Sequence, residues 1–109
     1  MYQVDLHSKN ATVDSALYQL EKSIELMRKT KEHIGCFIVG YGSTGGTHKI
    51  KTAILNALEE KLSKHQIKGY ILGSEIDIFN VKYQNLKGKE WIDEATKKRR
   101  NPGEVLVII

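Results

Sequence analysis

The sequence predicts an α/β fold: a two-layer sandwich with a mixed, mostly parallel four-stranded sheet and two main helices. Short apolar runs typical of strands alternate with amphipathic segments typical of helices. The closing segment 104–109 is almost continuously apolar, which indicates a strand buried on both faces, inside the sheet. The predicted order is β-α-β-α-β-β, and a length of 109 residues suits a single domain spanning 1–109.

The first strand and the first helix follow from two different periodicities. Residues 1–7 alternate between apolar and polar side chains, so Asp5 and His7 project to the same face of the predicted strand. Thr12 is the expected N-cap of a helix that ends near Thr30. The apolar stripe of this helix is expected to face the core and comprises Val13, Leu17, Leu20, Ile24 and Met27.

The middle of the chain predicts a second strand, a glycine-rich loop, a second helix and a third strand. The strand covers 36–39, the helix about 47–63 and the third strand 67–72. The apolar stripe of the second helix comprises Ile50, Ile54, Ala57, Leu58 and Leu62. Strands that alternate with helices are joined by right-handed crossovers. Two arrangements remain open at this point: both helices on one face of the sheet, or one helix on each face.

The segment before the last strand gives a weaker pattern. Residues 75–79 alternate and fit either a short strand or the start of a loop. A basic insert is expected at about 81–101, anchored by Tyr83, Leu86, Trp91 and Ile92, with a short helix over 90–98. The sequence Asn-Pro-Gly at 101–103 predicts a turn.

Composition and charge narrow the class of protein. Cys36 is the one cysteine and lies in an apolar run, so it is expected to be a small buried side chain in a cytoplasmic protein. No apolar run is long enough to span a membrane, and the first residues do not resemble a signal peptide. The whole net charge of +4 arises within 81–101. Such a basic patch is typical of a surface that binds a polyanionic partner. The alternative is a solvated loop that binds no partner.

The glycine-rich loop is the first candidate site. Its residues Tyr41, Gly42, Ser43, Thr44, Gly45 and Gly46 connect a strand to a helix. A helix N-terminus after such a loop offers unpaired N–H groups and a favourable dipole to an anion such as phosphate. Lys49 and Lys51 follow in the first turn, where they oppose the dipole unless something negative binds. The alternative is a tight turn without a ligand.

The second candidate site is the pair Asp5 and His7. Ligand sites lie at the carboxyl ends of parallel strands, so this pair faces the glycine-rich loop if the first two strands are neighbours. An imidazole oriented by a carboxylate can move protons in phosphodiester cleavage, while the loop N–H groups, Lys49 and Lys51 stabilise the developing charge. The alternative is an ordinary surface histidine at a strand end.

Other motifs fit less well. Residues 40–45 match the dinucleotide pattern G-x-G-x-x-G, but the chain is short for that fold and Glu75 lies too far downstream to be its acidic partner. Gly46 occupies the position of the lysine in a Walker A motif. The four histidines are scattered, so the sequence predicts no protein-built metal site.

Taken in order, three stretches resemble the small MutS-related (Smr) domain family. They are Val4–His7 for its D-L-H-G motif, 41–50 for its H-G-x-G loop and helix, and 101–107 for its closing turn and strand. The resemblance covers essentially the whole chain. It implies an α/β sandwich like the C-terminal domain of translation initiation factor 3, nucleic-acid binding, and in several members endonuclease activity on DNA or RNA.

The resemblance also implies roles for individual residues. Asp5 and His7 would be catalytic, and Gly42, Gly45 and Gly46 would shape the substrate loop. Two positions depart from the motifs: Ser8 stands where the family has glycine, and Tyr41 where many members have histidine. Tyrosine is a poor proton shuttle at neutral pH, so binding carries over more safely than cleavage.

The leading hypothesis is therefore a nucleic-acid-binding Smr-like domain with endonuclease activity, acting on structured or ribosome-associated DNA or RNA. The basic run Lys97, Lys98, Arg99 and Arg100 would follow the phosphate backbone. A divalent cation such as magnesium is the cofactor to test. The alternatives are a binding module that does not cut, a small nucleotide-binding enzyme, and a structural domain that acts through protein contacts.

Overall fold

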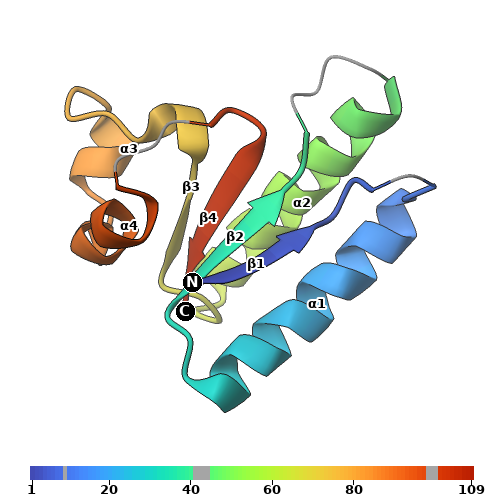
Figure 1. The fold of residues 1–109 in the computed structure, drawn as a ribbon, viewed down its shortest axis with the longest axis horizontal. Helices are drawn as coiled ribbons and strands as arrows, with labels where there is room; N and C mark the ends of the chain where they lie inside the picture. Colours follow the sequence, from blue (N-terminus) through green and yellow to red (C-terminus); the bar gives the residue numbers. More distant parts are fainter. Residues whose placement is uncertain (9, 41–44, 98–100) are drawn as a thin grey trace.

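The computed structural model describes residues 1–8, 10–40, 45–97 and 101–109 (Figure 1). In chain order the elements are β1 (Tyr2–Asp5), α1 (Val13–Thr30), β2 (Ile34–Ile38), α2 (Gly45–Ser63), β3 (Gly69–Leu72), the 3-10 turn η1 (Gly73–Glu75), α3 (Val81–Gln84), α4 (Lys89–Thr96) and β4 (Glu104–Ile108). This order confirms the predicted alternation of strands and helices. Residues 75–79, left open between strand and loop, form no strand: Glu75 ends η1 and the rest is turn and irregular structure.

The sheet has the strand order β1-β2-β4-β3. β1 and β2 pair in parallel, whereas β4 pairs antiparallel with β2 on one side and β3 on the other. Three strands therefore run in the same direction and β4 runs against them. All five residues of β4 are buried, which confirms that the apolar closing segment lies inside the sheet.

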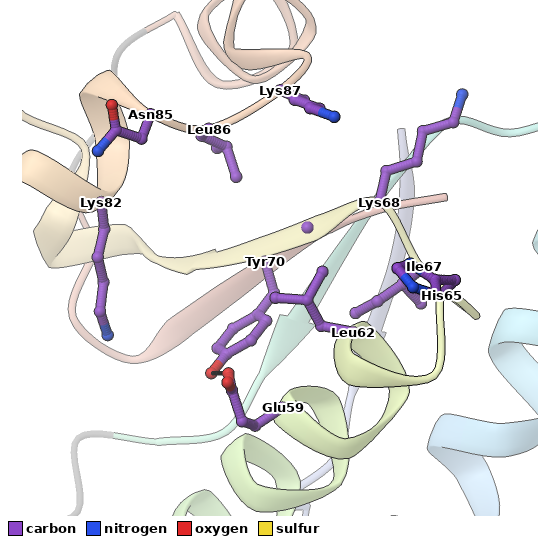
Figure 2. A pocket seen from close by; sticks show the side chains of 11 residues that line it. Glu59, Leu62, His65, Ile67, Lys68, Tyr70, Lys82, Asn85, Leu86 and Lys87 are labelled. Atoms are coloured by element: carbon purple, nitrogen blue, oxygen red, sulfur yellow. Dashed lines mark hydrogen bonds between the residues drawn. The ribbon is translucent and has the colours of Figure 1, made fainter.

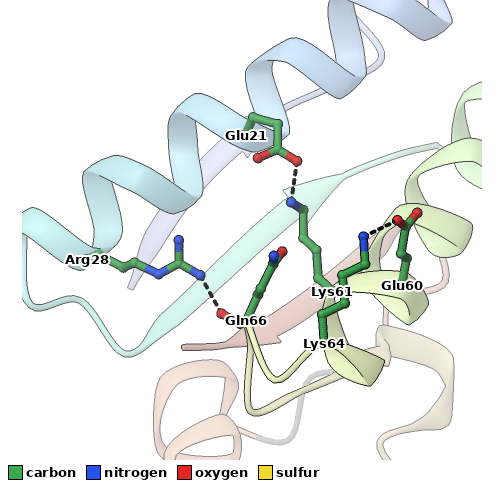
Figure 3. Close-up of polar contacts among 6 residues, drawn as sticks. All are labelled: Glu21, Arg28, Glu60, Lys61, Lys64 and Gln66. Carbon is green, nitrogen blue, oxygen red and sulfur yellow. Dashed lines mark hydrogen bonds and ion pairs between the residues drawn. The ribbon is translucent and has the colours of Figure 1, made fainter.

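Helices α1 and α2 both cover one face of the sheet, which decides between the two predicted arrangements (Figure 1). Their predicted stripes pack there against alternate side chains of the strands, such as Phe37 and Val105. Six stripe residues are buried and four are partly buried; the latter are Val13, Leu17, Ala57 and Leu62. Two polar contacts join the layer (Figure 3): Lys61 of α2 pairs with Glu21 of α1, and the Arg28 guanidinium donates to the Gln66 carbonyl oxygen. The Lys61 side chain is only 11% exposed, so α1 covers most of it.

The opposite face of the sheet is covered by the insert between β3 and β4 (Figure 1). All four predicted anchors contribute: Tyr83 and Ile92 are buried, while Leu86 and Trp91 pack against the same cluster. The Tyr83 hydroxyl of α3 donates a hydrogen bond to the Asp93 carboxylate of α4, which ties the two short helices together. Covering this face explains why Cys36 is fully buried, as predicted.

Helix α1 begins at Thr12, as the sequence indicates. The Thr12 hydroxyl accepts from the Ser15 N–H at 3.0 Å, and the Ser15 hydroxyl accepts from the Thr12 N–H at 2.9 Å. This reciprocal capping box satisfies N–H groups that the helix itself cannot pair. At the other end Lys31 adopts a left-handed conformation (φ 59°), and its N–H returns to the Met27 carbonyl.

A close backbone contact joins the end of β3 to the turn before β4. A Cβ placed on Gly73 would lie 2.0 Å from the carbonyl oxygen of Asn101. No side chain fits in that space, so glycine is required at position 73 if the two segments are to touch.

Among the helices of the described part, none is both long enough and apolar enough to cross a lipid bilayer.

We expect Gly73→Ala to lower the free energy of unfolding by about 1–3 kcal/mol, because the new methyl group must displace backbone atoms of Asn101. Gly69→Ala is the matched control, since its Cβ would meet only the terminal Leu86 Cδ1 at 2.8 Å, a flexible side-chain end. Urea unfolding of both variants measures the difference. Equal midpoints for the two variants would show that the contact does not constrain the fold.

Alkaline pH should destabilise the protein through Tyr83. Burial and the hydrogen bond to Asp93 raise the pKa of Tyr83 to about 12. The folded state then holds this proton more tightly than the unfolded chain, whose tyrosines titrate near pH ~10. The resulting stabilisation is complete below pH ~10 and is lost between pH ~10 and ~12, with a size on the order of 2 kcal/mol.

The variant Tyr83→Phe isolates this contribution. Urea unfolding at pH ~8 and pH ~11 should show a smaller loss of stability in the variant than in the wild type. The Tyr83→Phe variant should still lose some stability at pH ~11, because burial and the hydrogen bond to Glu59 also raise the pKa of Tyr70 to about 12. Tyr18→Phe is the control, since that side chain is 64% exposed. A loss identical in all three proteins would contradict the assignment.

Candidate functional site

One edge of the sheet collects the segments that the sequence marks as candidate sites. Because β4 runs against the other strands, its first residue lies beside the last residue of β2, Glu104 opposite Ile38. The Leu6 N–H donates to the Ile38 carbonyl at 2.8 Å, and the N–H groups of Val39 and Gly40 both donate to the Gly103 carbonyl at 2.8 and 3.1 Å. We call residues 5–7, 38–40 and 101–103 the carboxyl edge.

Asp5 and His7 form a hydrogen-bonded pair on the carboxyl edge. Asp5 Oδ1 lies 3.1 Å from His7 Nδ1 and also accepts from the His7 backbone N–H at 2.8 Å. The side chains are 46% and 34% exposed, respectively, so both remain open to a ligand. The predicted condition for this pair is met, since β1 and β2 are parallel neighbours and the chain leaves β2 toward the glycine-rich loop.

This geometry orients the imidazole for proton transfer. A carboxylate at Nδ1 favours the neutral tautomer that carries its proton on Nδ1 and leaves Nε2 as a bare acceptor. His7 Nε2 is then a candidate base with Asp5 as the residue that positions it. The tautomer follows from the hydrogen bond rather than from observed hydrogens.

The glycine-rich loop is described only in part. Tyr41, Gly42, Ser43 and Thr44 lie outside the described residues, whereas Gly45 and Gly46 form the first turn of α2, which starts two residues earlier than predicted. Helix α2 therefore begins directly after the segment that leaves the carboxyl edge. Its N–H groups and positive dipole end are available there to an anion.

The two lysines predicted beside this loop have different surroundings. The Lys51 ammonium lies 3.5 Å from the Pro102 carbonyl oxygen, which places it against the turn of the carboxyl edge. Lys49 is exposed on the neighbouring helix face and lines a groove of about 380 Å³. Because α2 starts at Gly45, both lysines lie in its second turn rather than in the first turn that the sequence predicts.

Sequence reasoning missed His48, which lines the same groove. This groove also contacts Val13 at the start of α1, and its α2 side extends from His48 to Asn56. The imidazole and the ammonium of Lys49 give one end of the groove polar groups that can contact an anion. His48 directly precedes Lys49 in the sequence, but a single histidine there forms no distinctive motif.

The basic run precedes the turn 101–103 in the sequence, and only Lys97 of it is among the described residues. Lys97 is exposed and ends α4 in a left-handed conformation (φ 54°). Lys98, Arg99 and Arg100 lie outside the described residues, and Asn101 then opens the turn. The Asn101 side chain accepts from the Gly103 N–H at 2.9 Å, which holds this turn in place. The run therefore leads directly into the turn that contacts Lys51.

Within the described ranges, no three histidine, cysteine, aspartate or glutamate side chains lie close enough together to hold a metal ion. Magnesium is commonly bound by one or two carboxylates together with phosphate oxygens of a substrate. Asp5 is the exposed carboxylate of the carboxyl edge that such an ion would use.

No protein-family model and no curated protein sequence matches this chain. Its fold is similar to the crystal structure of the Smr domain of MutS2 from Thermus thermophilus, with a TM-score of 0.61 and 17% sequence identity. The similarity covers 99% of this chain and 96% of that chain. The chain therefore has an Smr-like fold, which confirms what the ordered motifs predict.

Removal of the Asp5 carboxylate should change the tautomer of His7. In Asp5→Ala, neutral His7 loses its Nδ1 acceptor and should revert to the Nε2–H tautomer that free imidazoles favour. Long-range ¹H–¹⁵N NMR at alkaline pH distinguishes the two tautomers, with the exposed His65 as an internal control. If His7 is Nε2–H in the wild type as well, then the pair does not orient the ring.

Proposed function

We propose that this chain binds nucleic acid at the carboxyl edge and that Asp5 and His7 hydrolyse phosphodiester bonds there. The observation that carries the proposal is the Asp5–His7 pair that follows β1, at the end of the sheet where the Lys51 ammonium contacts the turn before β4. The Smr-like fold supports it, because the resemblance to that family implies nucleic-acid binding and, in several members, endonuclease activity.

Binding would rest on a row of cations along the edge. Lys49 and Lys51 flank the start of α2, Lys97 precedes the turn on the other side, and the run 98–100 adds three further positive charges. Cations spaced along an edge neutralise successive phosphates and release their counterions. The Asp5 carboxylate, which would repel a phosphate, is hydrogen-bonded to His7.

Cleavage would use the bare Nε2 of His7 as a general base. It would take a proton from the attacking water, while Asp5 stabilises the imidazolium that forms. As the water oxygen bonds to phosphorus, the P–O bond to the leaving sugar oxygen breaks, and that oxygen takes a proton from solvent. The lysines and the first N–H groups of α2 would stabilise the negative charge on the pentacoordinate phosphorus.

A binding module without cleavage is the second candidate. The observation that favours it is the identity of Tyr41 and Ser8, which stand where the resembled motifs carry histidine and glycine. Without a second imidazole in the loop, protonation of the leaving oxygen would have to come from water or from His48.

Salt tests the binding. If about four phosphates are contacted, log K should fall with log salt at a slope of about −3.6, so affinity drops roughly 100-fold between ~50 and ~200 mM salt. Fluorescence anisotropy with a labelled stem-loop RNA and a DNA duplex measures this salt dependence.

The double variant Lys49→Glu/Lys51→Glu should bind nucleic acid at least ~10-fold more weakly than the wild type. Lys22→Glu/Lys29→Glu, with both lysines exposed on α1, is the control of equal charge change. Salt-independent binding would contradict the proposal.

His7→Ala tests the cleavage. Supercoiled DNA and stem-loop RNA are incubated with and without magnesium, and the variant should lose at least ~100-fold in rate, within the range of a lost general base. Its affinity should stay within a few-fold of the wild type. A wild-type protein that binds nucleic acid but does not cut it would support the second candidate, a binding module without cleavage. A His7→Ala variant that cuts at the wild-type rate would show that His7 is not the general base.

A further inference from the structure

A second cavity, of about 660 Å³, lies at the other end of the sheet (Figure 2). It crosses the outer edge of β3, with α2 on one side and α3 with the segment after it on the other. It is lined by the first residues of β3, which pair with Ile108 at the end of β4. These positions are at the end of the strands opposite to the carboxyl edge, so the cavity is separate from the site described above.

The floor of this cavity is apolar. Leu62 of α2 and Leu86 contribute side chains, and Gly69 contributes bare backbone between them (Figure 2). A Cβ on Gly69 would lie 2.8 Å from Leu86 Cδ1, so the leucine lies directly against the strand. Leu62 belongs to the α1/α2 side of the sheet and Leu86 to the insert side, so the apolar lining extends across the edge of β3, where a base can pack against it.

The rim of the cavity is cationic. Lys68, Lys82 and Lys87 line it together with His65. Its one carboxylate, Glu59, accepts a hydrogen bond from the Tyr70 hydroxyl at 2.6 Å and is thereby directed along the wall (Figure 2). The Lys82 ammonium lies 3.5 Å from Glu75 on the exposed surface, a pair that a stronger anion can displace. The balance of charge therefore favours an anionic ligand.

A peptide strand added to β3 fits the cavity less well than a small molecule does. The outer edge of β3 is short, and the Leu72 N–H on it already donates to the Glu75 side chain at 3.1 Å. An added strand depends on a row of free backbone groups, which this edge lacks. A volume of about 660 Å³ is instead within the range of small-ligand sites.

We propose that this cavity binds a nucleoside phosphate. The base would lie on the floor formed by Leu62, Gly69 and Leu86, and the Asn85 amide offers both a donor and an acceptor to a base edge. The lysines of the rim would hold the phosphate. The ligand is either a free mononucleotide or an unpaired nucleotide of a strand, and only the second source rests on the proposed function.

The protein contains its own reporter for this test. Trp91 is the one tryptophan in the sequence, and the Lys68 ammonium lies 5.6 Å from the centre of its ring. A phosphate that attracts Lys68 away from the indole should change the fluorescence of Trp91. Titration with AMP, ADP and ATP should give dissociation constants on the order of 100 µM. Adenosine and inorganic phosphate should each bind at least ~10-fold more weakly, since each supplies half of the contacts.

The double variant Lys82→Glu/Lys87→Glu should lose at least ~10-fold in nucleotide affinity, because it reverses two charges of the rim. Lys22→Glu/Lys29→Glu, with both lysines exposed on α1, is the matched control and should bind AMP like the wild type. Because none of these four lysines is assigned to the carboxyl edge, the comparison tests this cavity even if nucleic-acid binding at that edge fails. The absence of any response to nucleotides at millimolar concentration, or equal binding by both double variants, would overturn the proposal. So would inorganic phosphate that binds as tightly as AMP.

A short single-stranded oligonucleotide identifies the source of the ligand. If the site takes a nucleotide of a strand, then the oligonucleotide should bind at least ~10-fold more tightly than AMP, and Lys82→Glu/Lys87→Glu should weaken it. Equal affinity of the oligonucleotide and AMP assigns the site to a free nucleotide.

Discussion

The pairing of β4 with β2 and β3 is the constraint on which the rest of the structure depends. β4 is the sole link between β3 and the rest of the sheet, and its side chains are buried alternately against both faces. Val105 and Val107 contact the layer of α1 and α2, whereas Leu106 and Ile108 contact the insert. Because each such side chain contributes about 1.5–3 kcal/mol when fully buried, this strand stabilises both layers at once.

The position of β4 also creates the carboxyl edge. A parallel strand in the same place would have brought the turn 101–103 to the opposite end of the sheet. The antiparallel direction instead places the Gly103 carbonyl where Val39 and Gly40 donate to it, and places Pro102 beside Lys51. The candidate site therefore depends on the direction of a strand that contributes none of its chemical groups.

The sequence predicted the elements better than their arrangement. Periodicity was sufficient for α1, α2 and the stripes that they pack against the core. The alternation over 1–7 predicted one strand carrying Asp5 and His7 on the same face, but β1 ends at Asp5, and His7 lies beyond it and is hydrogen-bonded to Asp5. The apolar run of β4 indicated burial on both faces but carried no information on direction, because a buried strand has the same composition either way. The direction depends on where the insert returns the chain, which is a long-range property. His48 was overlooked because a single histidine on an exposed helical face has no distinctive pattern.

The close approach of Gly73 to Asn101 has a consequence for how this fold can vary. The segment 74–100 leaves the sheet and returns to it at nearly the same point, so its length is hardly limited by geometry, and added residues cost little loop-closure entropy. What limits the segment is its apolar content: a shorter version would have to cover Ile71 and Leu106 by other means or expose them to water. Chains with this sheet can therefore differ widely between β3 and β4, provided that enough apolar side chains remain to cover the second face.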